Sequence, residues 1–588
     1  MTDQAQPAQG PGASGPGPDG AGFTYRGAEQ ELIVVARPEA RLRAEAEGVR
    51  SAAGADVSAL NMFLSDEQLA LQPLFGSEER LQSAAQPSAP GAETVPDLGL
   101  FYRVRGVESR AQELRSRIAA LPEIATAYVK PGAVPASVGS AGSMGSVGNS
   151  TDESRRRKEG APVTPDFTSR QGYLRPAPEG VDAHWAWQRP GGSGQGVTVI
   201  DVEGAWQLGH EDLAAKLAGV VVGTPIQDLA WRNHGTAVIG VIGGDRNEYG
   251  ITGIVPDTVT AAASFHGIGS AAAIHAAADR LNSGDIILVE LHSPGPRFDF
   301  AVRDDQRGYI PLEWWPDDFA AIRYATAKGV LVVEAAGNGG ESLDDAVYER
   351  RPDEFPEWWR NPFNPSNQSS GAIVVGAGAP PPGTHGRDHG PDRSRLAFSN
   401  YGARVDAQGW GREVTTTGGF WDKPGDLQGG AEEIAWFTDS FSGTSSASPL
   451  VVGALAALQG MLRAVGQDPM DPERARRLLR ATGSPQQDAP GRPASQRIGN
   501  RPDIKAAVAH LLPEAVGSGQ AERYWDELLP YPRELPPRLR LFVAGDWRSL
   551  NNPSAEIRQA VHSAFAGGRP DVRVWFSDDE IVGLVVTG

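Results

Sequence analysis

The stretch that decides the fold is Phe441–Pro449, which reads FSGTSSASP and leads directly into an apolar run. From Leu450 to Ala464, leucine, valine and alanine recur at helical spacing. This order places the hydroxyl of Ser445 at the start of a buried helix, where free N–H groups and the helix dipole stabilise negative charge. Such a position suits a nucleophile in acyl transfer, because an oxyanion forms beside the attacking oxygen. The alternative is an ordinary serine cap.

A histidine and an aspartate lie upstream of this serine, each beside a predicted helix or strand. Asn233–Gly243, NHGTAVIGVIG, predicts a helix of small residues that begins near His234. Gly196–Asp201, GVTVID, predicts a buried parallel strand that ends at Asp201, and α/β sheets place functional groups at this end of their strands. Each motif alone is a weak signal, because an isolated histidine or aspartate is more often structural. The chain order Asp, His, Ser is one of the known orders of a catalytic triad.

Four ordered segments together resemble the subtilisin-like serine proteases. They are Val199–Asp201 with His210–Leu213, then His234–Thr236, Val332–Gly339 and Gly443–Pro449. The resemblance spans roughly residues 167–511. It implies an α/β fold, with a mostly parallel sheet and helices on both faces. It also implies a serine endopeptidase that cleaves protein or peptide substrates through an acyl-enzyme.

The resemblance gives each matched residue an expected role. Ser445 is the expected nucleophile, His234 the general base, and Asp201 the carboxylate that orients the imidazole. Asn338 is expected to donate its side-chain amide to the oxyanion, beside the N–H of Ser445. The alternative is a catalytically silent scaffold that binds peptides or a partner protein, which the presence of all four residues disfavours. A lipase of the α/β-hydrolase type is excluded, because it needs the order Ser, Asp, His.

The family's substrate-binding strand corresponds to Ile286–Leu291, followed by HSPG. The family usually shows Ser-x-Gly-Gly there, and Pro294 lacks a backbone N–H, so we expect the pairing with substrate to differ. Glu290 and Glu334 lie near the presumed pocket, which leaves open a preference for a basic residue before the scissile bond. The implied substrate-binding residues are Leu291, His292, Ser293, Gly295 and Gly337.

The resemblance also implies a structural calcium ion, held by Asp212 and Asn247 with backbone carbonyls of Tyr249 and Ile251. Hard oxygen ligands of this kind suit Ca²⁺. The alternative is that Asp212 caps a helix and that the loop is free of metal. Zinc is not indicated, because the chain has no Cys and its ten His are scattered. No cofactor is expected for the chemistry itself.

The chain of 588 residues predicts several domains. An α+β unit before the catalytic domain resembles the family's prodomains, so we expect a zymogen whose N-terminal unit inhibits the protease and is removed by self-processing. The basic run Arg155–Lys158 is an alternative cleavage site for another protease. The predicted parts are a disordered tail (1–22), the prodomain-like unit (23–133), a flexible linker (134–163), the catalytic domain (164–511) and a C-terminal appendage, α/β or α+β, of unknown role (512–588).

Charge and composition limit the remaining function classes. The formal net charge of −19 argues against a nucleic-acid partner. No run approaches the roughly 18 apolar residues that would span a membrane. The N-terminal segment lacks the basic and apolar regions of a signal peptide, which predicts a cytoplasmic protein, with export by another route as the alternative.

Overall fold

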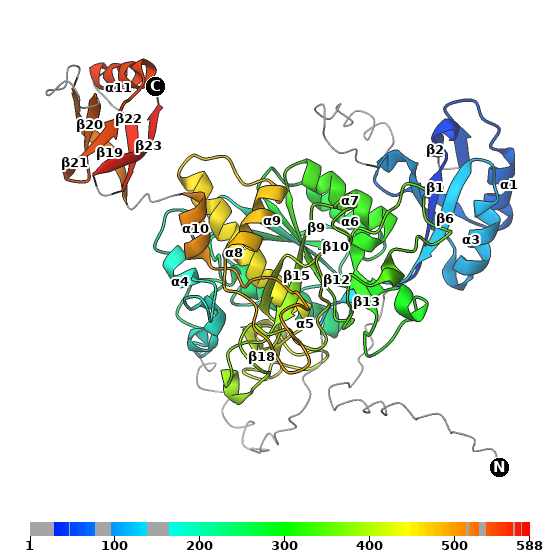
Figure 1. Ribbon diagram of the computed structural model, residues 1–588. Helices are drawn as coiled ribbons and strands as arrows, with labels where there is room; N and C mark the ends of the chain where they lie inside the picture. Colours follow the sequence, from blue (N-terminus) through cyan, green and yellow to red (C-terminus); the bar gives the residue numbers. More distant parts are fainter. Residues whose placement is uncertain are drawn as a thin grey trace, which may run out of the picture. The chain divides into compact units, whose positions relative to one another are not determined.

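The computed structural model describes residues 29–45, 48–76, 96–137, 164–512, 517–527, 537–567, 571–577 and 579–587 (Figure 1). The predicted tail and the basic run Arg155–Lys158 lie outside these residues. The chain divides into two compact units, Met1–Ile504 and Lys505–Gly588. This boundary lies slightly before the one that the sequence predicted, at 511–512.

A seven-stranded sheet forms the centre of the first unit, in the order β16-β15-β14-β11-β8-β10-β9. Each strand pairing in it is parallel, which confirms the predicted mostly parallel sheet. Its inner strands read as continuous apolar runs because both faces are covered. The strands are β8 (Thr198–Glu203), β9 (Leu217–Val222), β10 (Val259–Ser264), β11 (Ile286–Val289), β14 (Leu331–Ala335), β15 (Ile373–Gly378) and β16 (Ala407–Trp410).

Helices cover this sheet. Alternate residues of β8 and β11, such as Ile200 and Ile287, pack with α6 and α7 in one apolar cluster. The helices α5 and α8 pack against each other and against the same sheet. The described α-helices that follow residue 164 in this unit are α4 (Ala183–Ala186), α5 (Leu229–Gly243), α6 (Ser270–Ala278), α7 (Pro316–Ala327), α8 (Thr444–Ala464), α9 (Pro472–Ala481) and α10 (Ile504–Leu511), which crosses the unit boundary.

Among the residues that the structure describes, one helix, α8, is long and apolar enough to cross a membrane. Its apolar window is 100% buried within the fold. Its apolar character is therefore accounted for by packing in the core.

The N-terminal part of the first unit has its own four-stranded antiparallel sheet, in the order β4-β5-β1-β6. All six residues of β1 are buried. Leu32 and Val34 pack towards α1 and α3, whereas Ile33 and Val35 pack with the catalytic part. The elements are β1 (Glu31–Ala36), β2 (Leu42–Glu45), β3 (Gly48–Ser51), α1 (Ser58–Asp66), β4 (Ala70–Pro73), β5 (Phe101–Arg105), α3 (Ala111–Ala119) and β6 (Ile124–Lys130).

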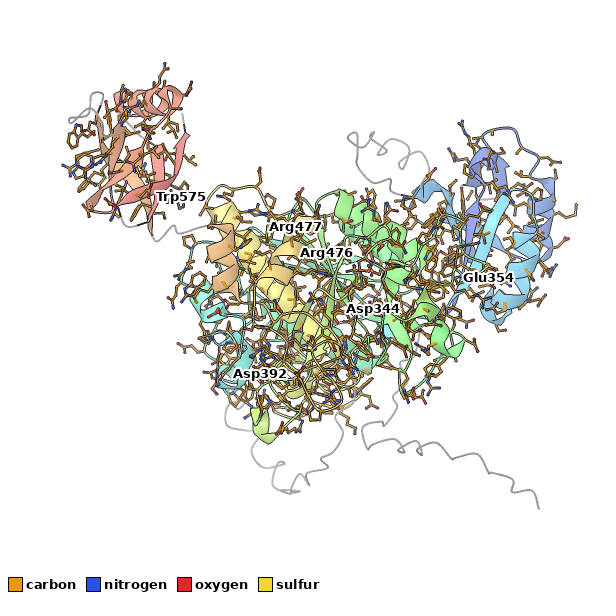
Figure 2. All side chains as sticks on the ribbon, in the orientation of Figure 1. Asp344, Glu354, Asp392, Arg476, Arg477 and Trp575 are labelled. Atoms are coloured by element: carbon orange, nitrogen blue, oxygen red, sulfur yellow. The ribbon has the colours of Figure 1, made fainter. Side chains whose placement is uncertain are left out.

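Polar contacts of β6 join this part to the catalytic part. The buried ammonium of Lys130 lies 3.0 Å from Oγ of Ser270 and 3.0 Å from Oδ2 of Asp318, and it also pairs with Asp317. The hydroxyl of Thr126 donates to the carbonyl of Glu354 at 2.6 Å, a residue labelled in Figure 2. The N-terminal part is therefore docked through both apolar and charged groups.

In its described residues the second unit forms a closed barrel of five strands, in the order β19-β20-β21-β23-β22, and helix α11 lies between β21 and β22 in the chain. The sequence predicted a C-terminal appendage of α/β or α+β type from residue 512 on. The elements are β19 (Gly517–Asp526), β20 (Arg538–Val543), β21 (Asp546–Asn551), α11 (Ala555–Ala566), β22 (Asp571–Ser577) and β23 (Glu580–Thr587).

Candidate active site

His234 lies in the second turn of α5, which packs closely on the chain that follows β8. The side chain of Asp228 caps this helix by accepting from the N–H of Ala230 at 3.0 Å. Gly235 allows the close packing, because a Cβ there would lie 2.4 Å from the carbonyl oxygen of Ala205. The helix thereby holds the imidazole of His234 against the carboxyl end of β8.

The carboxylate on this imidazole is Glu203. Nδ1 of His234 lies 2.6 Å from Oε1 of Glu203, while Oδ2 of Asp201 accepts from the indole N–H of Trp206 at 2.7 Å. Asp201 and Glu203 lie two positions apart on β8, so both face the same side. The hydrogen bond in the structure therefore differs from the predicted pairing of His234 with Asp201. A second carboxylate two residues after the motif aspartate was the signal that could have revealed it.

Burial dominates the electrostatics around His234. It raises the pKa of Asp201, Glu203 and Glu290 well above their usual values, and for Asp201 and Glu290 nearby carboxylates add to this effect. Burial lowers the pKa of His234 to about 3, and the charge of Asp201 acts in the opposite direction. The imidazole is therefore neutral near physiological pH, which is the form that a general base requires.

Ser445 is the second residue of α8 and is fully buried. Its N–H donates to the carbonyl oxygen of Ala136 at 3.0 Å, and its Oγ lies 3.5 Å from the carbonyl oxygen of Glu290. Gly443, with φ of 104°, makes this approach possible, because a Cβ there would lie 2.2 Å from the carbonyl oxygen of Ala136. A peptide carbonyl of the chain itself thus lies at the start of α8.

This carbonyl belongs to the segment that follows the N-terminal sheet. Strand β7 (Val134–Pro135) pairs antiparallel with β12 (Leu291–Pro294), with Leu291 opposite Pro135 and His292 opposite Val134. The N–H of Ala136 then donates to the carbonyl oxygen of Glu290 at 3.1 Å. The segment lies extended along the predicted substrate-binding strand and brings the Ala136–Ser137 bond to Ser445.

Asn338 lies in the turn after β14 and contacts the residue before Ser445. Its Oδ1 accepts from the backbone N–H of Thr444 at 3.0 Å, and its Nδ2 donates to Oε1 of Gln306 at 3.0 Å. The sequence predicted that this amide donates to an oxyanion, and Gln306 takes one of its two N–H groups. Gln306 was not predicted, because it lies between β12 and β13 (Tyr309–Pro311) and outside every matched motif.

The other predicted substrate-binding residues lie at two different places. Leu291 and His292 pair with β7, as described above. Ser293 accepts from the indole N–H of Trp315 at 2.9 Å, and the N–H of Gly295 donates to the carbonyl of Gly308 at 2.9 Å. The N–H of Gly337 donates to the hydroxyl of Thr444 at 3.2 Å. The structure therefore brings Leu291, His292 and Gly337 to the site, whereas Ser293 and Gly295 contact the chain around β13.

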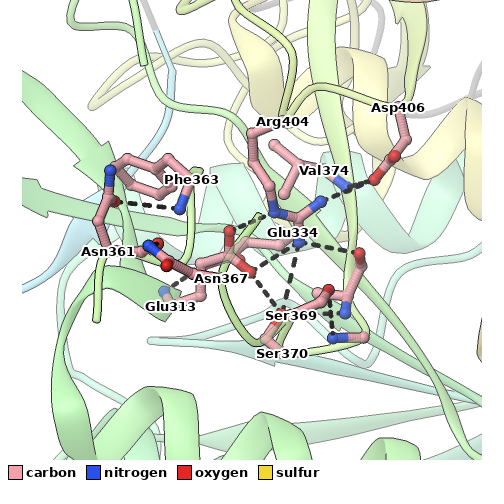
Figure 3. A network of polar contacts seen from close by, with 12 residues as sticks. Glu313, Glu334, Asn361, Phe363, Asn367, Ser369, Ser370, Val374, Arg404 and Asp406 are labelled. Carbon is pink, nitrogen blue, oxygen red and sulfur yellow. Dashed lines mark hydrogen bonds and ion pairs between the residues drawn. The ribbon is translucent and has the colours of Figure 1, made fainter. Parts of the chain in front are cut away.

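Glu334 belongs to a buried polar network instead (Figure 3). Its Oε1 accepts from the backbone N–H of Glu313 at 2.9 Å. Arg404 binds Glu313 through two N–H groups, at 2.6 and 2.7 Å, and Asp406 at 2.9 Å. Because its carboxylate is engaged in this network, Glu334 gives no support to a preference for basic residues.

The predicted calcium ligands form a hydrogen-bonded turn. Asp212 accepts from Nδ2 of Asn247 at 2.7 Å and from the N–H of Ile251 at 2.7 Å. Oδ1 of Asn247 accepts from the N–H of Tyr249 at 2.9 Å. In the part of the chain that the structure describes, no group of three His, Cys, Asp or Glu side chains is arranged to hold a metal ion. The oxygens of Asp212 and Asn247 accept N–H groups in this turn, and calcium binding there stays a prediction.

The model of the Subtilase family matches residues 194–500, which is more than half of the chain and includes His234, Asn338 and Ser445. The chain belongs to the subtilase family. All the residues of this candidate active site except Ala136 and its neighbours in β7 lie within the matched region.

Individual relatives resemble this subtilase over part of their length. The thermophilic serine proteinase of Bacillus sp. (strain AK1) is 30% identical over 313 residues, which cover 50% of this chain and 60% of that protein. The intracellular serine protease of Paenibacillus polymyxa is 27% identical over 320 residues, 52% of this chain and 78% of its own. Fervidolysin from Fervidobacterium pennivorans, a keratinolytic enzyme related to subtilisin, superposes with a TM-score of 0.46 at 17% identity and covers 86% of this chain and 64% of its own.

Proposed function

We propose that this subtilase is a serine endopeptidase that first cuts its own chain between Ala136 and Ser137. One observation carries the proposal: the N–H of Ser445 donates to the carbonyl oxygen of Ala136 at 3.0 Å. A carbonyl held in this way is polarised, and its carbon lies beside the serine that would attack it. In this contact Ser445 has the position of a nucleophile, and Ala136 has the position of the substrate residue that it attacks.

In the proposed reaction, Oγ of Ser445 attacks the carbonyl carbon of Ala136, and His234 takes the hydroxyl proton. The negative charge that develops on the carbonyl oxygen is stabilised by the N–H of Ser445, with the second N–H of the Asn338 amide as the further donor. Glu203 holds Nδ1 of His234 and stabilises the imidazolium, in the role first predicted for Asp201.

The C–N bond then breaks. His234 returns its proton to the amine of Ser137, which leaves as a new N-terminus, while Ala136 remains as an ester on Ser445. A water molecule, deprotonated by His234, attacks this ester and releases Ala136 with a free carboxylate. After the segment leaves, the same residues are available to other protein or peptide substrates.

The N-terminal unit is proposed to remain bound after the cut and to inhibit the protease. Its sheet is buried against α6 and α7, and Lys130 stays paired with Asp317 and Asp318. A product held by such a surface blocks the cleft until it is removed. The silent scaffold is disfavoured, because a scaffold has no need to hold a peptide carbonyl on the N–H of a serine.

The test compares intact masses of the full-length chain with and without Ser445→Ala. We expect the wild type to yield two fragments, one that ends at Ala136 and one that begins at Ser137, while Ser445→Ala stays whole. Ser495→Ala, a change of an exposed serine, is the matched control and should be cut like the wild type.

Two outcomes would overturn the proposal. If Ser445→Ala is cut at the same bond in purified form, another protease makes the cut. If the wild type stays whole and also fails to hydrolyse casein, the chain is a binding scaffold. A cut at another bond would preserve the protease and exclude Ala136–Ser137 as its first target.

A further inference from the structure

The residue that carries the carbonyl held at Ser445 is an alanine, and the imidazole of His292 lies on the same face of the strand pair. His292 is directly opposite Val134 in the pairing of β12 with β7, and opposite residues point to one face. Ala136 lies two positions after Val134 in the same extended segment, so its methyl group points to that face too. A diagonal neighbour of this kind lies within reach of an aromatic ring.

The ring of His292 is fixed in place. It is fully buried, and its Nδ1 accepts from the backbone N–H of Asn338 at 3.2 Å. The ring of Tyr309 packs against it, with 4.8 Å between the ring centroids. A rotation of His292 would leave the N–H of Asn338 unpaired in a buried position, which is unfavourable.

The hydrogen bond from Asn338 also defines the state of the ring. Nδ1 accepts this hydrogen bond, so the neutral ring carries its own proton on Nε2. Burial lowers the pKa of His292 to about 3, and His234 contributes in the same direction. The ring therefore keeps this acceptor at neutral pH.

The ring of His292 packs against the turn that follows β14. It reaches from β12 to the turn at Gly337 and Asn338, and a Cβ on Gly337 would lie only 3.3 Å from its Nδ1. Gly337 and Asn338 in turn contact Thr444, next to Ser445. The gap between β12 and this turn, on the face to which Ala136 points, is thus occupied by protein.

We infer that His292 is a specificity-determining residue that restricts the position before the scissile bond to small residues: Ala, Gly or Ser. A larger side chain there meets a ring that cannot move aside without losing two contacts. This inference rests on the proposed function and adds the class of substrate that the site accepts. It also replaces the open expectation of a basic residue at this position.

The test uses the ratio of two self-processing rates in the full-length chain. The rate of the native Ala136 chain is divided by the rate of Ala136→Phe, both followed by intact mass over time. We expect a ratio above about 100 with His292 present and a ratio below about 10 with His292→Gly, because a pocket that excludes a side chain by shape commonly discriminates by 10–200-fold. The inference also predicts that Ala136→Ser, which keeps a small side chain at this position, is cut far faster than Ala136→Phe.

Two results would overturn the inference. Equal rates for Ala136 and Ala136→Phe in the wild-type background would show that the cleft accepts large residues, while the protease itself would stand. An unchanged ratio in His292→Gly would assign the restriction to another residue.

A second measurement tests the inference without a variant, in case His292→Gly does not fold. The matured wild-type enzyme is offered peptides of the form Ala-Val-Pro-X-Ser, and hydrolysis after Ala, Gly or Ser is expected to exceed hydrolysis after Phe, Leu or Lys by at least about tenfold. Faster hydrolysis after Lys or Phe would contradict the inference. No hydrolysis of any peptide, together with an uncut full-length chain, would instead count against the proposed function.

Discussion

Oε1 of Glu203, the last residue of strand β8, lies 2.6 Å from Nδ1 of His234. Asp201, which the motif had indicated, lies two residues earlier and binds the indole of Trp206. The additional methylene of glutamate and its later position on the strand bring its carboxylate to the imidazole. The pairing suggests that the two acids contribute differently to the reaction.

Glu203→Gln is expected to slow self-processing of the full-length chain by about 10³–10⁴-fold, because a glutamine cannot stabilise the imidazolium and can favour the wrong tautomer. Asp201→Asn is expected to slow it by less than about tenfold, since its hydrogen bond from Trp206 can be kept. Cleavage rates measured by gel densitometry decide between them, with circular dichroism as the control for folding. The reverse order of effects would assign the orienting role to Asp201.

The pH dependence of the first cut is expected to differ from that of later cuts. With the segment in place, burial lowers the pKa of His234 to about 3, so the base stays neutral well below pH 6. Once the segment leaves, the imidazole is hydrated and its pKa rises towards about 6.5. Self-processing at pH 5 should therefore stay within about threefold of its rate at pH 7.5, while peptide hydrolysis by the matured enzyme falls by about tenfold or more.

Both pH profiles are measured on the same preparation. Self-processing is followed by mass spectra of samples quenched at successive times, and peptide hydrolysis by the matured enzyme is followed with a fluorogenic peptide. Recovery of full peptide activity after return to pH 7.5 is the control for acid inactivation. If the rates of self-processing and of peptide hydrolysis both fall around pH 6.5, burial by the segment does not set the pKa of His234.

Lys130→Ala is expected to loosen the docking of the N-terminal unit. Its ammonium is buried between Asp317 and Asp318, and removal of one partner from a buried charge cluster commonly costs about 3–5 kcal/mol. In the uncut Ser445→Ala background we expect the Tm to fall by several degrees. Arg117→Ala, which breaks a half-exposed pair with Glu67, is the matched control and should change Tm far less. If Lys130→Ala and Arg117→Ala lower the Tm equally, Lys130 does not contribute more to docking of the N-terminal unit than an ordinary surface ion pair does.

Calcium is expected to leave the stability of the protein unchanged. Asp212 accepts hydrogen bonds from Asn247 and Ile251, and burial raises its pKa to about 7. Because this pKa exceeds the unfolded value of about 3.9, the folded chain binds the proton more tightly, and stability is lost as pH rises through about 4 to 7. Asp212→Asn, which carries no charge, should therefore show a smaller fall in Tm between pH 5.5 and 8 than the wild type.

The comparison is made by thermal unfolding with excess EGTA and with millimolar CaCl₂, using Ser445→Ala to prevent cleavage. The two Tm values should agree within about 1 °C, because calcium stabilises the folded chain only if it binds to it. A rise of several degrees with CaCl₂ that Asp212→Asn abolishes would establish a calcium site in this loop.

The sequence alone determined those parts of the molecule whose signal is local. The apolar runs at β8 and β11 predicted the parallel sheet, because strands buried on both faces need apolar residues at every position. The motifs around His234, Asn338 and Ser445 predicted candidate site residues, and Asn338 contacts Thr444, next to Ser445, in the structure. The calcium expectation rested on position alone, without the hydrogen bonds that decide how an oxygen is used.

Only the tertiary structure decided which partners these residues take. Glu203 rather than Asp201 contacts His234, Gln306 binds Asn338, and Ala136 reaches Ser445 from across 308 intervening residues. His292 lies opposite Val134, two residues before Ala136, because β7 joins β12 in one particular register. Such pairings depend on distances of a few ångströms between segments far apart in the chain, and no local pattern of residues encodes them. The sequence therefore indicated the residue types of the candidate site, and long-range packing decided their geometry and which segment of the chain lies at Ser445.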